Sequence, residues 1–221
     1  MLDIQKLSFA FGKHQLYHEL DIQFMPGHVT GVVGANGVGK TTLFRIIAGI
    51  YKIQHGTLLL NNKKFSSSDI AFMPTEPFFY PYMKGYEYLQ IVANTNDELR
   101  KSEIYAERLQ LPLNELVDNY STGMKKKLAF SAIFSLQKPV IILDEPYNGV
   151  DLHGNEIMKH LIKTESEEKV VILSSHILHT LLDICDKIYH FAGNTVVDEY
   201  FRAEFKGLES KIKEDIVGIS E

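Results

Sequence analysis

Two hydrophobic patterns follow one another along the chain. In residues 2–11 and again in 20–24, apolar side chains recur at nearly every second position, up to the turn Pro26-Gly27. Such alternation predicts a pair of antiparallel strands. Three later runs, 29–33, 139–143 and 170–173, are continuously apolar and of strand length. Strands that are apolar on both faces are typical of a parallel sheet covered by helices, so the pattern predicts an α/β fold with an antiparallel start.

Between about residues 77 and 136 the strand signals nearly vanish. Apolar residues take helical spacing in 86–93, 97–109 and 123–136, which predicts a helical insert that interrupts the sheet. The tail mixes lysines and glutamates with spaced apolar residues, and this favours an amphipathic helix. The expected organisation is one domain over 1–221, with a core of about 1–76 and 137–199, an insert of about 77–136 and a tail of about 200–221.

Composition limits the classes of function. The 221 residues are 45% hydrophobic and 23% charged, as in an ordinary globular domain. The formal net charge of −5 provides no positive field to attract nucleic acid, so we expect no nucleic-acid partner. The single cysteine, Cys185, excludes a disulfide within the chain and indicates a packed thiol. Because no signal-peptide pattern and no apolar run of about 20 residues is found, we expect a cytoplasmic chain that reaches a membrane only through a partner.

A loop rich in glycine lies between an expected strand and an expected helix, and it reads GANGVGKTT. Its spacing fits the phosphate-binding pattern GxxxxGK[ST], in which backbone N–H groups surround phosphate oxygens. The lysine would reach the β- and γ-phosphates and the first threonine would coordinate Mg²⁺. A glycine-rich turn with an incidental lysine is the alternative, but the flanking strand and helix favour a nucleoside triphosphate site. The predicted binding residues are Gly34, Ala35, Asn36, Gly37, Val38, Gly39, Lys40, Thr41 and Thr42.

Two carboxylates, Asp144 and Glu145, follow the apolar run 139–143 directly. Ligands of open α/β sheets bind at the carboxyl ends of the strands. Asp144 therefore suits Mg²⁺, together with Thr41, and Glu145 suits activation of the attacking water. Taken alone, the pair could equally be a solvated turn before Pro146, but the phosphate-binding loop favours the catalytic interpretation.

Five motifs occur in an order that resembles the nucleotide-binding subunit of ATP-binding cassette (ABC) transporters. The resemblance covers nearly the whole chain, up to about Val197, and it implies ATP as the nucleotide. Any one motif beyond the phosphate-binding loop is weak, whereas five in order are specific. The motifs are GANGVGKTT, YSTGM at 120–124, LDEP at 143–146, NGVD at 148–151 and SSH at 174–176.

The resemblance implies roles for five further residues. Ser121 and Gly123 belong to the signature segment (120–124), which in the family caps the γ-phosphate bound by a second subunit. Asp151 lies in the D-loop (148–151), which crosses the dimer interface; His176 would contact the γ-phosphate, and Phe11 would stack on adenine. From the residues alone, Ser121 is also a helix N-cap, His176 an ordinary helix-start residue and Phe11 a core aromatic. Since Ser121 and Asp151 have no evident partner within one chain, we expect a second ATPase subunit, either a copy or a paralogue.

One departure from the family pattern concerns the joint between core and insert. The family has a glutamine there that touches Mg²⁺, and this chain has Thr75. A threonine is too short to reach as glutamine does, which leaves Glu76 as a candidate substitute. In the signature segment, Thr122 and Met124 replace the commoner glycine and glutamine, which we regard as a mild change.

The resemblance implies a subunit that binds and hydrolyses ATP to power transport through a separate integral membrane subunit, with export favoured over import. The ATPase subunit itself would lie at the cytoplasmic face of the membrane. The helical insert and the Thr75 joint would form the docking face for the membrane subunit. The aromatic segment 78–83 lies at the insert edge and suits a groove for a short partner helix, with local core packing as the alternative. Two alternatives stay open. One is a soluble ABC ATPase that assembles metal clusters or macromolecular complexes, and the other is a nucleotide-gated clamp that barely turns over, motivated by the missing glutamine.

Overall fold

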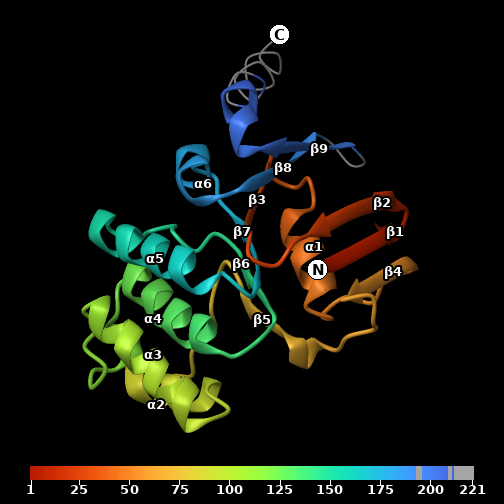
Figure 1. Cartoon of the computed structure of the whole chain (residues 1–221). Helices are drawn as coiled ribbons and strands as arrows, with labels where there is room; N and C mark the ends of the chain where they lie inside the picture. Colours follow the sequence, from red (N-terminus) through yellow and green to blue (C-terminus); the bar gives the residue numbers. More distant parts are fainter. Residues whose placement is uncertain (193–195, 209–210, 212–221) are drawn as a thin grey trace.

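The computed structural model describes residues 1–192, 196–208 and 211, and it contains two β-sheets (Figure 1). The smaller sheet is antiparallel, in the order β2-β1-β4. The larger sheet has the order β5-β6-β7-β3-β8-β9, and all its strands are parallel except β9. The strands are β1 (Leu2–Phe11), β2 (His14–Phe24), β3 (Val29–Gly34), β4 (His55–Leu60), β5 (Ile70–Met73), β6 (Val140–Leu143), β7 (Val170–Ser174), β8 (Lys187–Ala192) and β9 (Val196–Phe201).

Figure 1 shows the helices α2, α3 and α4 gathered on one side of the molecule and the antiparallel sheet on the other. The helices are α1 (Lys40–Ile47), α2 (Gly85–Val92), α3 (Asn96–Arg108), α4 (Thr122–Ser135), α5 (Leu152–Glu165) and α6 (Leu178–Ile184), with short 3₁₀ turns η1 (Ser67–Asp69), η2 (Val117–Asn119) and η3 (Arg202–Glu204). The predicted α/β fold, with its antiparallel start and helical insert, is therefore confirmed.

Alternating side chains of the central strands divide the core in two. On β6, Ile141 and Leu143 face a cluster with helices α2 to α6, whereas Val140 and Ile142 face a second cluster with α1 and the antiparallel sheet. All four are fully buried. Because successive side chains of a strand point to opposite faces, a continuously apolar strand supplies both clusters at once. The parallel sheet is thus covered on both faces, and ligands of such sheets bind at the carboxyl ends of the strands.

The tail differs from the expectation. Tyr200 and Phe201 complete β9 and pair with β8, and the chain then forms η3 and a short helical stretch over 205–208. The prediction of a helix that starts at residue 200 is therefore wrong, because Tyr200 and Phe201 pair with Ile188 and Lys187 in the sheet. The rest of that prediction, over 209–210 and 212–221, lies outside the described residues. Cys185 is fully buried, which confirms the packed thiol, and this burial raises its pKa.

Candidate functional site

The carboxyl ends of β3, β6 and β7 meet at one edge of the larger sheet, and a cavity of about 380 Å³ opens there. A larger polar groove of about 1080 Å³ lies beside β1, β2 and β8, but no residue of 34–42 and neither strand-end carboxylate lines it. Chemistry and topology therefore mark the smaller cavity as the candidate site. Its lining residues are Phe11, His14, Leu16, Asn36, Gly37, Gly39, Lys40, Thr41, Thr42, Thr75, Asp144, Glu145 and His176.

The glycine-rich loop connects β3 to α1 through backbone conformations that favour glycine. Gly37 and Gly39 have φ of +83° and +115°. At Gly39 an added Cβ would lie 2.5 Å from the hydroxyl oxygen of Tyr17, which itself donates a hydrogen bond to the Gly39 carbonyl at 2.6 Å. The loop can therefore turn only with glycine at this position, and the turn brings the N-terminus of α1 to the cavity.

Lys40 is the first residue of α1, and only 7% of its surface is exposed. Its Nζ donates to the carbonyls of Gly34 at 2.7 Å and Ala35 at 3.0 Å. Desolvation lowers the pKa of this ammonium, and the nearby carboxylates of Glu145 and Asp144 oppose that shift. A buried cation at a helix N-terminus suits a polyphosphate.

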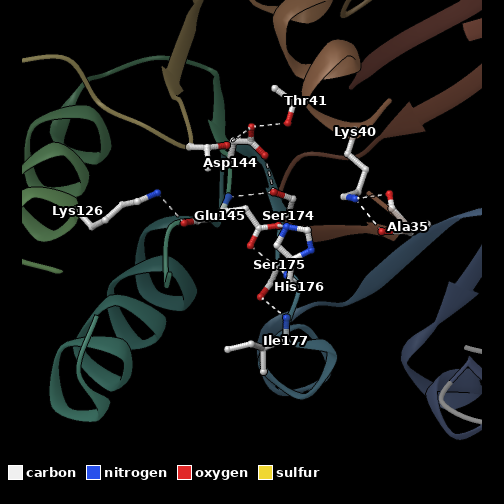
Figure 2. Close-up of polar contacts among 12 residues, drawn as sticks. Ala35, Lys40, Thr41, Lys126, Asp144, Glu145, Ser174, Ser175, His176 and Ile177 are labelled. Carbon is white, nitrogen blue, oxygen red and sulfur yellow. Dashed lines mark hydrogen bonds and ion pairs between the residues drawn. The ribbon is translucent and has the colours of Figure 1, made fainter. Parts of the chain in front are cut away.

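Asp144 is 1% exposed and accepts hydrogen bonds from three hydroxyl groups. Thr41 donates to its Oδ2 at 2.8 Å and Ser174 to its Oδ1 at 2.7 Å (Figure 2). Thr75 also donates to Oδ2, at 2.7 Å. Mg²⁺ prefers oxygen ligands such as carboxylates and hydroxyls, so the oxygen atoms of Asp144 and Thr41 fit the expected metal. Thr75 therefore reaches the Asp144 carboxylate directly, whereas the exposed Glu76 does not line the cavity.

Glu145 follows Asp144 with a positive φ of 53°. Its backbone N–H donates to Ser174 Oγ at 3.0 Å, and its Oε2 accepts from the backbone N–H of His176 at 3.0 Å. The His176 ring places Nε2 3.3 Å from Glu145 Oε1. The carboxylate is thus held at the cavity wall beside a half-exposed imidazole, in a position where it could accept a proton from a water molecule.

Phe11 lies at the cavity and is 48% exposed, so it is not a core residue. Its ring makes edge contacts with Phe9 and Tyr51. His14 and Leu16 also line the cavity. Sequence analysis missed these two because nothing in an alternating strand distinguishes them.

Ser121, Gly123 and Asp151 do not line the cavity. Ser121 caps α4, because its Oγ accepts from the N–H of Met124 at 3.2 Å. Asp151 caps α5, with Oδ1 accepting from the N–H of Gly154 at 2.7 Å, and its Oδ2 pairs with Lys127. The prediction of Ser121 as a helix N-cap is therefore confirmed, whereas Asp151, for which no partner within the chain was expected, also caps a helix.

A glycine-rich loop that ends in Lys-Thr at a helix start, facing Asp144 and Glu145 at strand ends, defines a P-loop nucleotide-binding site. Residues 17–148 match the ABC transporter family, so the chain belongs to this family. Proteins of this kind bind ATP and hydrolyse it to power transport. The ATP-binding cassettes of this family typically dimerise and pair with a membrane subunit.

Two relatives illustrate the sequence similarity. The chain is 30% identical over 200 residues to an uncharacterized ABC transporter ATP-binding protein, YdbJ of Bacillus subtilis (strain 168). The alignment covers 85% of this chain and 65% of YdbJ, so the chain spans less than two thirds of that relative. It is 27% identical over 219 residues to the lantibiotic transport ATP-binding protein SrtF of Streptococcus pyogenes, covering 95% and 93%.

Solved structures share the fold at lower identity. One ATP-binding subunit of an ABC transporter superposes with a TM-score of 0.87 at 20% identity and covers all of both chains. A bacterial Atm1-family ABC exporter with ATP bound gives a TM-score of 0.84 at 14% identity, over 95% of this chain and 41% of the exporter chain. Within the part of the chain that the structure describes, no helix is long and apolar enough to cross a membrane.

Proposed function

We propose that the chain, as one ABC ATPase domain over 1–221, powers export through a separate integral membrane subunit. The observation that carries the proposal is the joint placement of Lys40, Thr41, Asp144 and Glu145 around one cavity at the strand ends. Similarity to SrtF, which is named for lantibiotic transport and is matched over 93% of its length, supports a transporter subunit of the exporter type.

In the proposed mechanism, Lys40 and the backbone N–H groups of 34–42 hold the phosphates of ATP. Thr41 and Asp144 would hold Mg²⁺, which neutralises charge that develops on the phosphate oxygens. Glu145 accepts the proton of the attacking water as the bond between the γ-phosphorus and the ADP oxygen breaks. His176 lies next to Glu145 and orients the carboxylate through its backbone N–H.

We propose a second ATPase subunit as the partner at the open face of the cavity. Three observations support this. Ser121 is exposed at the N-terminus of α4. Ile177, which follows the cavity residue His176, is 56% exposed, and Leu152, the first residue of α5, is 79% exposed. Such side chains suit an isologous contact in which each Ser121 approaches the ATP of the other chain.

Light scattering tests the proposed dimer. Glu145→Gln should slow hydrolysis strongly and keep ATP bound, so the mass of this variant should double at saturating ATP, while Lys40→Ala should stay monomeric under the same conditions. A strictly monomeric Glu145→Gln protein at saturating ATP would count against the shared site.

The proposed docking face for the membrane subunit is the aromatic segment 78–83 at the edge of the insert. Phe78, Tyr80 and Tyr82 are 70%, 58% and 82% exposed. Exposed aromatic side chains that gather in one segment suit a groove that receives a short helix of a partner. In this arrangement the subunit lies at the cytoplasmic face of the membrane.

Purification of the tagged chain from detergent-solubilised membranes tests the proposed function. We expect one integral membrane protein to accompany the parent chain and to be lost from a Phe78→Ser, Tyr80→Ser double variant that still binds ATP. If the parent chain and the double variant are both recovered with a soluble assembly scaffold and without any membrane protein, the result would contradict the transporter assignment. It would support the alternative of a soluble ABC ATPase that assembles complexes.

A further inference from the structure

One lysine of α4 reaches into the site of its own chain. Lys126 lies in the second turn of α4 and is 4% exposed. Its Nζ donates a hydrogen bond of 2.9 Å to the backbone carbonyl of Glu145. Figure 2 shows this side chain extending from α4 to Glu145, on the side away from His176 in that view. The contact joins the helix that begins after Ser121 to the strand end that carries the proposed base.

Glu145 needs such support because its backbone is in the left-handed region. A residue with a side chain is strained in this sparsely populated conformation, and the conformation persists only where neighbouring groups hold it. Here the N–H of Glu145 donates to Ser174, and its carbonyl accepts from Lys126 at 2.9 Å and, at the longer distance of 3.4 Å, from the N–H of Asn148. Both peptide groups that flank the Glu145 Cα are therefore fixed, and with them the direction of the side chain.

Packing alone does not account for a lysine at this position. Burial lowers the pKa of Lys126, while the carboxylates of Asp144, Glu145 and Glu76 oppose the shift. Burying an ammonium costs free energy that an apolar residue of similar volume would not require. Methionine could fill much the same space but could not donate to the Glu145 carbonyl.

We propose that Lys126 is a positioning residue for ATP hydrolysis. It holds the Glu145 peptide in the left-handed conformation that directs the carboxylate to the cavity beside His176. Lys126 is part of α4, the helix that Ser121 caps. It therefore connects two parts of the proposed mechanism, the contact that Ser121 makes with a second subunit and the base Glu145 in its own subunit. This inference rests on the proposed role of Glu145.

Kinetics of Lys126→Met separate positioning from general structural support. We expect the turnover number to fall at least about tenfold, the effect of about 1.4 kcal/mol of lost transition-state stabilisation. The dissociation constant for a fluorescent ATP analogue should change less than about threefold, because Lys126 does not line the cavity. Lys125→Met, the same substitution one residue earlier on a half-buried side chain, should keep the parent turnover.

A double-mutant cycle completes the test. In the Glu145→Gln background, Lys126→Met should cause no further loss in single-turnover hydrolysis, because Lys126 acts through Glu145. Parent-like turnover of Lys126→Met, a comparable loss in Lys125→Met, or full additivity in the Gln background would overturn the inference.

The experiments distinguish a wrong assignment of Glu145 as the base from a wrong assignment of Lys126 as a positioning residue. If Glu145→Gln hydrolyses ATP at the parent rate, the proposed role of Glu145 is wrong, whereas an inactive Glu145→Gln with a fully active Lys126→Met refutes only the positioning role. Should Lys126→Met not fold, Lys126→Gln is measured through the same cycle, and its shorter amide should still lower turnover.

Discussion

Gly123→Ala perturbs the contact between the signature segment and the D-loop within one chain. A Cβ added at Gly123 would lie 2.3 Å from the carbonyl oxygen of Gly149 and 3.3 Å from the Cα of Val150. A carbon and a carbonyl oxygen normally approach no closer than about 3.3 Å, so the two segments must separate by about 1 Å. Overpacking of this kind costs about 1–3 kcal/mol.

Urea unfolding and steady-state ATP hydrolysis measure the two expected effects. The free energy of unfolding should fall by about 1–3 kcal/mol. Turnover should fall as well, because the N-terminus of α4 and the neighbouring ion pair of Lys127 with Asp151 are displaced together. Gly207→Ala is the control: no atom lies within 4 Å of its added Cβ, so stability should change by less than about 0.5 kcal/mol. Equal stabilities for the two variants would refute the close contact at Gly123.

Three further predictions follow from the site and from the insert. Lys40→Ala should weaken ATP binding at least about 100-fold, through loss of charge-assisted hydrogen bonds worth about 3 kcal/mol; near-unchanged affinity in a nucleotide titration would contradict the site. Thr75→Val removes one donor to Asp144 and should raise the Mg²⁺ concentration for half-maximal hydrolysis about tenfold, whereas an unchanged Mg²⁺ titration would show that Thr75 does not position this carboxylate. The pKa of Glu98 lies below its ordinary value, because backbone and amide N–H donors outweigh the opposing effect of burial. The contribution of the Glu98 carboxylate to stability is then present above about pH 4.3 and is lost as the pH falls through the folded-state pKa. The free energy of unfolding of Glu98→Gln should therefore lie below that of the parent at pH 7 and converge with it in acid. A difference between the two free energies that does not change with pH would contradict this.

The local patterns of the sequence predict most of the fold and the nucleotide loop. Continuous apolar runs locate β3, β6 and β7, because a strand buried on both faces needs nothing else to be recognised. The sequence analysis missed β4, β8 and β9, and the first two have physical reasons. β4 is an edge strand whose residues are exposed or half-buried, so it has no apolar alternation. β8 buries Lys187 and His190 among its apolar residues, and these interrupt the expected run.

The site divides in the same way. Lys40, Thr41 and the two strand-end carboxylates are contiguous with recognisable elements, and the structure brings them to one cavity. Lys126 stands in a run of three lysines that resembles a solvated helix face, and only tertiary packing reveals that it is buried. The hydrogen bond from Thr75 to Asp144 likewise depends on how two loops far apart in sequence approach each other.

The central claim is that Glu145 activates water at an ATP site built by 34–42 and Asp144. Hydrolysis by Glu145→Gln, measured at an ATP concentration that a binding titration shows to be saturating, tests this claim most directly. The substitution preserves shape and removes the base, so turnover should fall about 10²- to 10⁴-fold with ATP affinity retained. Hydrolysis at the parent rate with ATP fully bound would contradict the claim and place the base elsewhere, with His176 the first residue to test.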